Sequence, residues 1–445
     1  MKYNKLSLSF SNKSNYIYII AITMSAFLIR LIIAMAYYNQ VDLLNYNISW
    51  MDSLKDGLFD VYERNSSIDY PPIYLILLYP LSFLLNIDAV LKESTLLMLV
   101  LKIVPVIIDT LMIPLIWYIF NKRSPKTAIF VASLWAVNVS GIINSSLWGQ
   151  TDTIMAFILI LSFYFLENDK PILGGIMFAL CAVTKFQALY FAPIVFLELI
   201  TKYNWKKVLK SIGAGVLLGI IVFIPFMIGS KYPSLVFDLY LGGFDKYSYA
   251  TLNAFNFYGV IGLNAVPTNQ SFGYGYTGII SDLFKWLRID IFGLIMMILS
   301  IALIVFLYFK AKRKSIWVFS FLFMQCIFML TTKMHERYQF IVVPLCLIAA
   351  FMHDDMRFFK SYIALTVITA INQFALLLAY NNSQGNIWYN SFGNIVTIFS
   401  IVNFLIFIYT VFITVKWCFE KPSHMHEDMK EITIKKTNNM PSEGI

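Results

Sequence analysis

The chain has 445 residues, of which 59% are hydrophobic, 17% aromatic and only 13% charged. Apolar runs of about twenty residues, the length that crosses about 30 Å of hydrocarbon, recur from end to end. This composition excludes a soluble protein, and the net charge of +9 does not indicate nucleic-acid binding, because the basic residues gather in short clusters between apolar runs. Such clusters are typical of the cytoplasmic loops of membrane proteins. Because the apolar runs are continuous rather than alternating, they predict an all-α polytopic membrane protein.

The first helix is expected over about 16–38, with its preceding lysines cytoplasmic. A long external loop, about 39–70, follows and is rich in acidic residues. Within it, apolar residues at spacings of three and four over 43–59 predict an amphipathic helix on the membrane face, ended by Gly57. Pro71 and Pro72 are expected to open the next helix, because proline fits the first helical turn.

The region from 73 to 120 is harder to divide, since an odd number of crossings must connect an external loop to the basic loop at 121–126. We expect three crossings, with the second apolar run split into two short helices near Pro105 and Asp109. Lys102 and Asp109 are expected to pair or to snorkel. The four cysteines, dispersed in apolar runs without CxxC spacing, are expected to be buried thiols that form neither a disulfide nor a zinc site.

The remaining runs alternate across the membrane. We expect a hairpin of two short helices over 172–200, bent near 184–187, and a long external region over 230–290. The single transmembrane domain then covers 1–419 with twelve to fourteen helices, and a hydrophilic cytoplasmic tail covers 420–445. The other expected spans are 127–143, 151–167, 211–229, 291–309, 315–331, 338–352, 361–380 and 392–418.

This topology places several polar motifs on one side of the membrane, where they can share a cavity. Asp42 follows the first helix and is the candidate general base, which must reach the proton of an attacking hydroxyl; the alternative is an ordinary solvated carboxylate. In the WGQTD motif at 148–152, Trp148, Gln150 and Asp152 can form a platform for a sugar. The alternative there is that Thr151 or Asp152 caps a helix.

The HERY motif at 335–338 supplies candidate ligands for a phosphate, because arginine can hold a phosphate bidentately. His335, Arg337 and Lys185 are the candidate phosphate-binding residues. The alternatives are an interfacial snorkelling cluster for the motif and a structural ion pair for Lys185. No tight cluster of His, Asp and Glu predicts a metal site, so no metal ligand is assigned, although a divalent cation remains an open alternative.

Two asparagines in the external region, Asn253 and Asn256, can contact a sugar or form part of a lid. The alternative is that they fold this region onto the membrane face. The full set of candidate sugar- or acceptor-binding residues is Asp69, Tyr70, Trp148, Gln150, Asp152, Gln187, Asn253, Asn256 and Glu336.

The motifs, in their order along the chain, resemble those of bacterial GT-C glycosyltransferases, in particular those related to GPI mannosyltransferase II. The resemblance spans about residues 20–380. It is carried by the first-loop Asp42 and by DYPP at 69–72, WGQTD at 148–152, TKFQ at 184–187, LNAFN at 252–256 and MHERY at 334–338.

The resemblance implies a GT-C-type bundle that moves a hexose, mannose-type favoured, from a polyprenyl-phosphate donor to an extracytoplasmic glycan, lipid or cell-wall polymer. It implies Asp42 near the reacting centre, His335 and Arg337 near the donor phosphate, and a bacterial plasma membrane with both termini cytoplasmic. The first loop has Asp42-Leu43 where some relatives have paired acids, which leaves a metal requirement open. A lipid-linked sugar flippase or transporter and a lipid-linked polysaccharide polymerase are the alternative functions.

Overall fold

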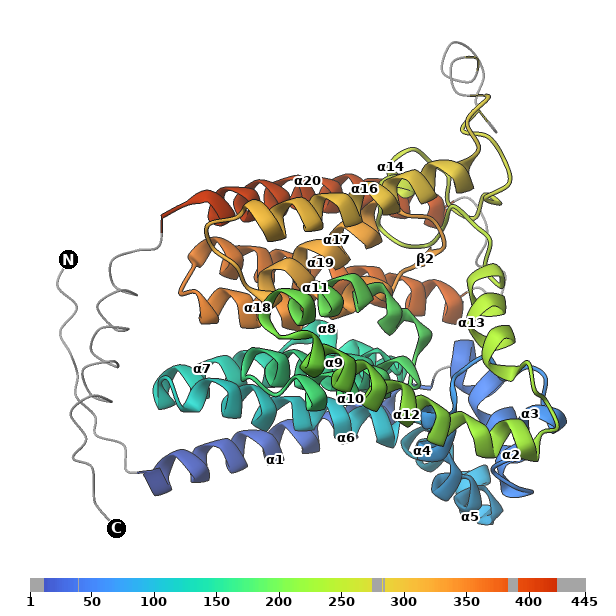
Figure 1. Ribbon diagram of the computed structural model, residues 1–445. Coiled ribbons are helices and arrows are strands. Elements are labelled where there is room, and N and C mark those ends of the chain that lie inside the picture. Colours follow the sequence, from blue (N-terminus) through green and yellow to red (C-terminus); the bar gives the residue numbers. More distant parts are fainter. Residues whose placement is uncertain (1–11, 39, 274–281, 283–284, 383–390, 422–445) are drawn as a thin grey trace.

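The computed structural model describes residues 12–38, 40–273, 282, 285–382 and 391–421. The chain forms a bundle of helices, which confirms the expected all-α polytopic membrane protein. Short helices and loops gather at one end of the bundle, here called the loop end and marked by α2, α4 and α13 (Figure 1). The start of α1 and the end of α20 both lie at the opposite end (Figure 1). The expected tail at 420–445, apart from its first two residues, and part of the 230–290 region lie outside the described residues.

The first part of the chain builds one side of the loop end. After α1 (Asn12–Ala36) come the short π helix η1 and α2, which together replace the single amphipathic helix expected over 43–59. Trp50, Met51 and Leu54 form the buried face of α2. Pro72 opens α4 as expected, with Pro71 in extended conformation before it. The elements in this part are η1 (Gln40–Asn47), α2 (Ile48–Lys55), α3 (Val61–Arg64), α4 (Pro72–Ser82), η2 (Phe83–Asn86) and α5 (Asp88–Lys92).

The expected split of the second apolar run is wrong. A single helix, α6 (Ser94–Asn121), runs through both Pro105 and Pro114. Proline is tolerated inside membrane helices where neighbouring groups satisfy the freed carbonyls. Because α4 and α5 stay at the loop end (Figure 1), α6 alone leads to the opposite end, and one crossing replaces the expected three.

Asp109 pairs with Arg30 rather than with Lys102, so that expected pair is also wrong. The Nε atom of Arg30 lies 2.7 Å from Oδ2 of Asp109, and neither side chain is exposed. Asp109 also accepts hydrogen bonds from Trp135 Nε1 and Ser145 Oγ, while Arg30 donates to the carbonyl of Ala136. This network ties α1, α6 and α7 together inside the membrane.

The middle of the chain contains a bent span and a short-helix hairpin. The bent span comprises α7 (Pro125–Ala136), α8 (Val139–Ile142) and the π helix η3 (Ile143–Trp148), with a 46° bend at its break. The expected hairpin is present as α10 (Pro171–Ala182), η4 (Phe186–Phe191) and α11 (Ala192–Lys202). Helix α9 (Asp152–Glu167) precedes it and α12 (Trp205–Gly229) follows it.

A two-residue parallel ladder joins the long loop after α12 to the HERY motif. In it, β1 (Thr251–Leu252) pairs with β2 (Met334–His335), so that Leu252 lies opposite His335. The loop also carries α13 (Leu235–Asp245) and α14 (Phe257–Val260). The remaining elements are α16 (Ile289–Lys310), α17 (Ile316–Leu330), η5 (Tyr338–Ile341), α18 (Val342–Met352), α19 (Met356–Asn382) and α20 (Ser391–Phe419).

The expected count of twelve to fourteen spanning helices treated every apolar run as a full span. By length and composition, six helices among the described residues qualify, or seven if the bent pair counts as one. Helices such as α10 and α17 have 12 and 15 residues. At about 1.5 Å per residue they cover roughly 18–23 Å, less than the ~30 Å of a hydrocarbon core. These shorter helices are packed into the centre of the bundle.

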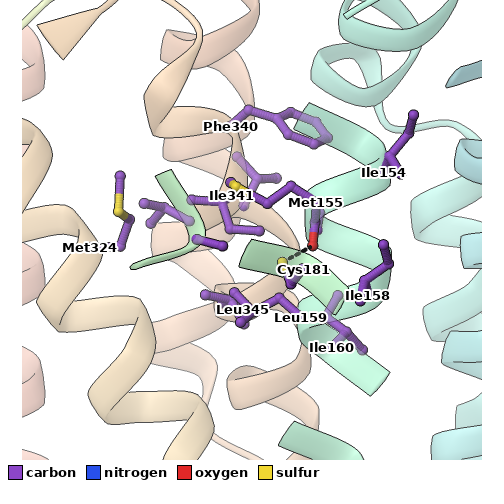
Figure 2. Close-up of a cluster of buried hydrophobic side chains, with 14 of the residues drawn as sticks. Ile154, Met155, Ile158, Leu159, Ile160, Cys181, Met324, Phe340, Ile341 and Leu345 are labelled. Atoms are coloured by element: carbon purple, nitrogen blue, oxygen red, sulfur yellow. Dashed lines mark hydrogen bonds between the residues drawn. The ribbon is translucent and has the colours of Figure 1, made fainter. Parts of the chain in front are cut away.

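The centre of the bundle is apolar and closely packed, as Figure 2 shows for the meeting point of α9, α10, α17 and α18. There Met155, Leu159, Ile341 and Leu345 are buried, and the Sγ atom of Cys181 donates a hydrogen bond to the Met155 carbonyl over 3.3 Å. All four cysteines are buried, free thiols, which confirms their expected burial. This rigid centre holds the segments that reach the loop end.

Candidate functional site

A pocket opens at the loop end, with a volume of about 760 Å³ out to its mouth. Six separate stretches of the chain line it. The candidate residues that it brings together are Asp42, Asp69, Tyr70, Gln150, Lys185, Gln187 and Arg337, and further lining residues include Tyr46, Trp50, Tyr74, Tyr247 and Tyr338.

Asp42 lies in η1, and its carboxylate is held from one side. Its Oδ2 atom accepts hydrogen bonds from Trp148 Nε1 over 3.0 Å and from Gln150 Nε2 over 2.5 Å, and it lies 4.0 Å from Nη1 of Arg337. Its Oδ1 atom has no polar partner among the described residues, and 27% of the side chain is exposed. One carboxylate oxygen is therefore fixed while the other can receive a proton.

Gly149 lets the two donors on either side of it reach the same oxygen. The π helix η3 ends there in left-handed conformation, with φ at +84°. A Cβ atom at this position would lie 2.9 Å from Cγ of Lys102 and 3.2 Å from a methyl group of Leu43. Only glycine fits both the backbone angle and the space. The sharp turn points Trp148 and Gln150 at Asp42.

Arg337 supplies the positive charge of the pocket. Its Nη1 atom lies 2.8 Å from Oε1 of Glu336, and its guanidinium lies 5.6 Å from the centre of the Trp148 ring. Burial lowers the pKa of Arg337, but the carboxylates of Asp42 and Glu336 more than offset that effect, and the pKa ends well above its usual value. The Nε atom has no hydrogen-bond partner in the described part of the chain. Arg337 is thus a permanent cation, and its Nε atom remains available as a hydrogen-bond donor.

The two residues that precede Arg337 in the HERY motif, His335 and Glu336, lie deeper in the protein. Burial raises the pKa of the Glu336 carboxyl to about 7, against the opposing effect of Arg337. Burial, followed by the charges of Arg337 and Lys185, holds the pKa of His335 well below its usual value, so that its ring is neutral. Neither residue belongs to the pocket lining.

His335 instead lines a small cavity that shares its wall with the pocket. The shared residues are Phe186, Gly243, Tyr247 and Tyr338. The His335 ring lies 4.8 Å from the Tyr247 ring, measured between centres, and its Nε2 atom has no partner among the residues described.

Lys185 and Asp152 form a buried ion pair beneath the pocket. The Nζ and Oδ1 atoms lie 2.5 Å apart, and each side chain is only 2% exposed. Burial lowers the pKa of Lys185, and Asp152 opposes that shift. The structural ion pair left open by the sequence is therefore present, although Lys185 also lines the pocket. Thr151, considered as a helix cap, makes no side-chain capping bond and donates to the Tyr70 hydroxyl instead.

At the mouth of the pocket, Asp69 is held by the loop after α13. Its Oδ2 atom lies 2.8 Å from Nζ of Lys246, and that ammonium lies 5.8 Å from the ring centres of both Tyr46 and Tyr247. The contact links the first loop to the 230–290 region.

Gln187 lines the pocket but is partly engaged by a neighbouring residue. Its Nε2 atom donates to the Tyr338 hydroxyl over 2.8 Å, which leaves Oε1 without a partner among the described residues.

The two asparagines expected as sugar contacts are not part of the pocket lining. Asn256 caps α14, because its Oδ1 atom accepts from the backbone N–H groups of Tyr258 and Gly259. Asn253 has a left-handed φ of 56°, and its Oδ1 atom accepts from Nδ2 of Asn264. These contacts favour the alternative that both residues fold the loop onto the bundle.

The chain matches a protein-family model over part of its length. Residues 69–261 match the model of glycosyltransferase family 87, a family of the GT-C type. The match contains the WGQTD motif and Lys185 but excludes Asp42 and the HERY motif. No curated protein matches the chain. The family match and the membrane helices together support a membrane glycosyltransferase.

Proposed function

We propose that the protein transfers a hexose, mannose-type favoured, from a polyprenyl-phosphate donor to an extracytoplasmic acceptor with inversion at the anomeric carbon. The observation that carries the proposal is the shared pocket of Asp42 and Arg337, with Oδ2 and Nη1 only 4.0 Å apart. A candidate base and a permanent cation face the same space. Displacement of a phosphate by a hydroxyl needs both.

In the proposed reaction, the free Oδ1 atom of Asp42 takes the proton of an acceptor hydroxyl. The hydroxyl oxygen then forms a bond to the anomeric carbon. The bond between that carbon and the phosphate oxygen breaks, and its electron pair leaves with polyprenyl phosphate. Configuration inverts because attack and departure occur on opposite faces of the sugar.

Arg337 is proposed to hold the phosphate as negative charge develops on it. Its guanidinium has spare donors and can bind two phosphate oxygens at once. His335 is neutral and lines the adjoining cavity rather than the pocket, so it adds no charge beside the phosphate. Lys185 adds positive potential from beneath, partly cancelled by Asp152. Aromatic residues such as Trp50 and Tyr70 offer faces for sugar rings.

The location proposed for the protein is a bacterial plasma membrane, with the pocket on the outer side and both termini cytoplasmic. The start of α1 and the end of α20 lie at the end of the bundle opposite the pocket (Figure 1). This arrangement supports placing the pocket and the two termini on opposite sides of the membrane. A donor that arrives through the membrane is consistent with a chain made almost entirely of apolar helices.

The test is transfer from polyprenyl-phosphate hexose in membranes that contain Asp42→Asn or the native protein. We expect the variant to lose at least about 100-fold in kcat, the lower end of the range of about 10²- to 10⁴-fold for a general base. Asp88→Asn is the matched control, because Asp88 is exposed on α5 and pairs only with Lys92. Full activity of Asp42→Asn would overturn the proposal.

The same assay separates the alternative functions. A glycosyltransferase forms a new glycosidic bond and releases polyprenyl phosphate, whereas a flippase only moves the lipid-linked sugar. Exclusive use of diphosphate-linked oligosaccharides would identify a polymerase instead.

A further inference from the structure

We propose that Lys102 is a positioning residue for the Asp42 carboxylate, an inference that rests on the proposed role of Asp42 as the base. Lys102 lies within the membrane-spanning helix α6, and its side chain is fully buried. Its ammonium has no carboxylate partner among the described residues, and the proposed reaction does not use it. Buried cations in membrane helices are rare and tend to serve function.

The ammonium of Lys102 binds carbonyl groups at the C-terminal end of α1. Its Nζ atom donates to the carbonyl of Ala34 over 3.1 Å and to the carbonyl of Tyr37 over 2.6 Å. Helix α1 ends at Ala36, so these carbonyls lie in its final turn and just beyond it, where carbonyl groups lack partners within the helix. A cation there also interacts favourably with the negative, C-terminal end of the helix dipole. Lys102 thereby fixes the point from which the chain runs into η1 and Asp42.

The aliphatic part of the same side chain supports the turn that orients Asp42. The Cγ atom of Lys102 packs so close to Gly149 that a Cβ atom there would lie 2.9 Å from it. Gly149 separates Trp148 and Gln150, the two donors to Oδ2 of Asp42. One buried side chain thus contacts both the segment that carries the carboxylate and the turn that holds it in place.

Loss of the ammonium leaves two carbonyls at the end of α1 without their partner, and Asp42 can then shift relative to its donors. A shift of about 1 Å in a reacting group can reduce a rate by up to about 100-fold. Donor binding should change little, because the contacts of Lys102 are with the end of α1 and with Gly149 rather than with Arg337. A change in kcat with little change in KM is therefore the expected signature.

The experiment compares Lys102→Met and Lys102→Arg in the full chain, with polyprenyl-phosphate hexose as donor and a defined acceptor. We expect Lys102→Met to lower kcat roughly 10- to 100-fold while the donor KM stays within about threefold. Lys102→Arg should retain most activity, because it keeps the stem and can still donate to carbonyls. The matched control is Lys92→Met, which removes an exposed lysine on α5.

A double variant shows whether Lys102 acts through Asp42. In the Asp42→Asn background, Lys102→Met should cause no additional loss, because coupled residues are not additive. An equal loss in both backgrounds would overturn the inference, since it would indicate general damage to the fold.

Other outcomes are equally decisive. If Lys102→Met does not accumulate in membranes, Lys102→Gln, which retains one donor group, takes its place. Accumulation of Lys102→Arg alone would assign Lys102 to assembly and overturn the positioning role. An unchanged kcat for Lys102→Met overturns only this inference, whereas full activity of Asp42→Asn overturns the proposed function itself.

Discussion

The Oδ2 atom of Asp42 and the Nη1 atom of Arg337 lie 4.0 Å apart, although the two residues come from opposite parts of the sequence. Trp148 contacts both, because its Nε1 atom donates to Asp42 and its ring lies 5.6 Å from the Arg337 guanidinium. The candidate base and the candidate phosphate ligand therefore both contact Trp148, and a change in Trp148 is expected to affect both.

Replacement of Arg337 should lower both the stability of the fold and the transfer activity, and a second substitution should restore only the stability. Arg337→Gln leaves Glu336 buried without its cation, and removal of one partner from a buried pair costs roughly 3–5 kcal/mol. We expect the lower end of that range, because the Glu336 carboxyl, with a pKa of about 7, readily takes up a proton. Thermal unfolding in detergent measures this effect. The double variant with Glu336→Gln should recover stability but not transfer; recovered transfer would exclude Arg337 as the phosphate ligand.

Glu336 should make donor affinity depend on pH. Its pKa is raised from the ordinary value of 4.5 to about 7, so the group is neutral below pH 7 and ionised above it. Once ionised, it competes with the donor phosphate for Arg337. We expect the donor KM to rise about 3- to 10-fold between pH 6 and pH 8.

Glu336→Gln, which cannot ionise, is the control and should show no such rise. A rise of the same size in this variant would assign the pH dependence to another group. The raised pKa also predicts that the free energy of unfolding decreases as pH increases from 4.5 to 7, because the folded state binds the proton more tightly than the unfolded state.

Trp148→Phe tests the support of the base while keeping an aromatic ring beside Arg337. It removes the 3.0 Å hydrogen bond from Nε1 to Asp42. A hydrogen bond to a charged group contributes about 1.5–3 kcal/mol, so we expect kcat to fall at least about 10-fold. Trp205→Phe, at an exposed position on α12, provides the control. Unchanged kcat would show that Gln150 alone holds the carboxylate.

Asp69 and Lys246 distinguish a sugar contact from a link between loops. The ion pair is partly exposed, so its loss should reduce the free energy of unfolding by no more than about 1 kcal/mol. If Asp69 acts only through Lys246, Asp69→Asn and Lys246→Gln should change the acceptor KM equally, and the double variant should match either one. A much larger effect of Asp69→Asn would support direct binding of a sugar by its carboxylate. Initial rates at varied acceptor concentration give the answer.

The fold class and the positions of most helices could be predicted because hydrophobic length is a strong signal. The single helix α6 could not, because Pro105 and Asp109 break a helix unless other segments satisfy the groups involved. Here Arg30, Trp135 and Ser145 satisfy Asp109, and all three are distant in sequence. A pattern confined to one segment cannot reveal such partners.

The convergence of the polar motifs on one pocket was predicted from topology, but the partner of each side chain was not. The pairs Lys185 with Asp152 and Lys246 with Asp69 depend on the packing of α9 and on the path of the loop after α13. Asn253 and Asn256 lie outside the pocket for the same reason, since the Asn253 carbonyl accepts from Asn372 on α19 and the Asn256 side chain donates to the Phe328 carbonyl on α17. The order of the motifs therefore predicted which segments meet, whereas contacts between distant segments determine which side chains pair.

The pair formed by Arg30 and Asp109 has a consequence for biogenesis. Arg30 enters the bilayer with the first helix, yet its counter-ion lies on α6, and the carbonyl groups of Trp135 and Ala136 that also accept from it lie on α7. During synthesis, the first helix therefore carries an uncompensated cation until α6 and α7 have also been inserted. We therefore expect the translocation machinery to hold the nascent N-terminal half as one unit and to release α1, α6 and α7 into lipid together.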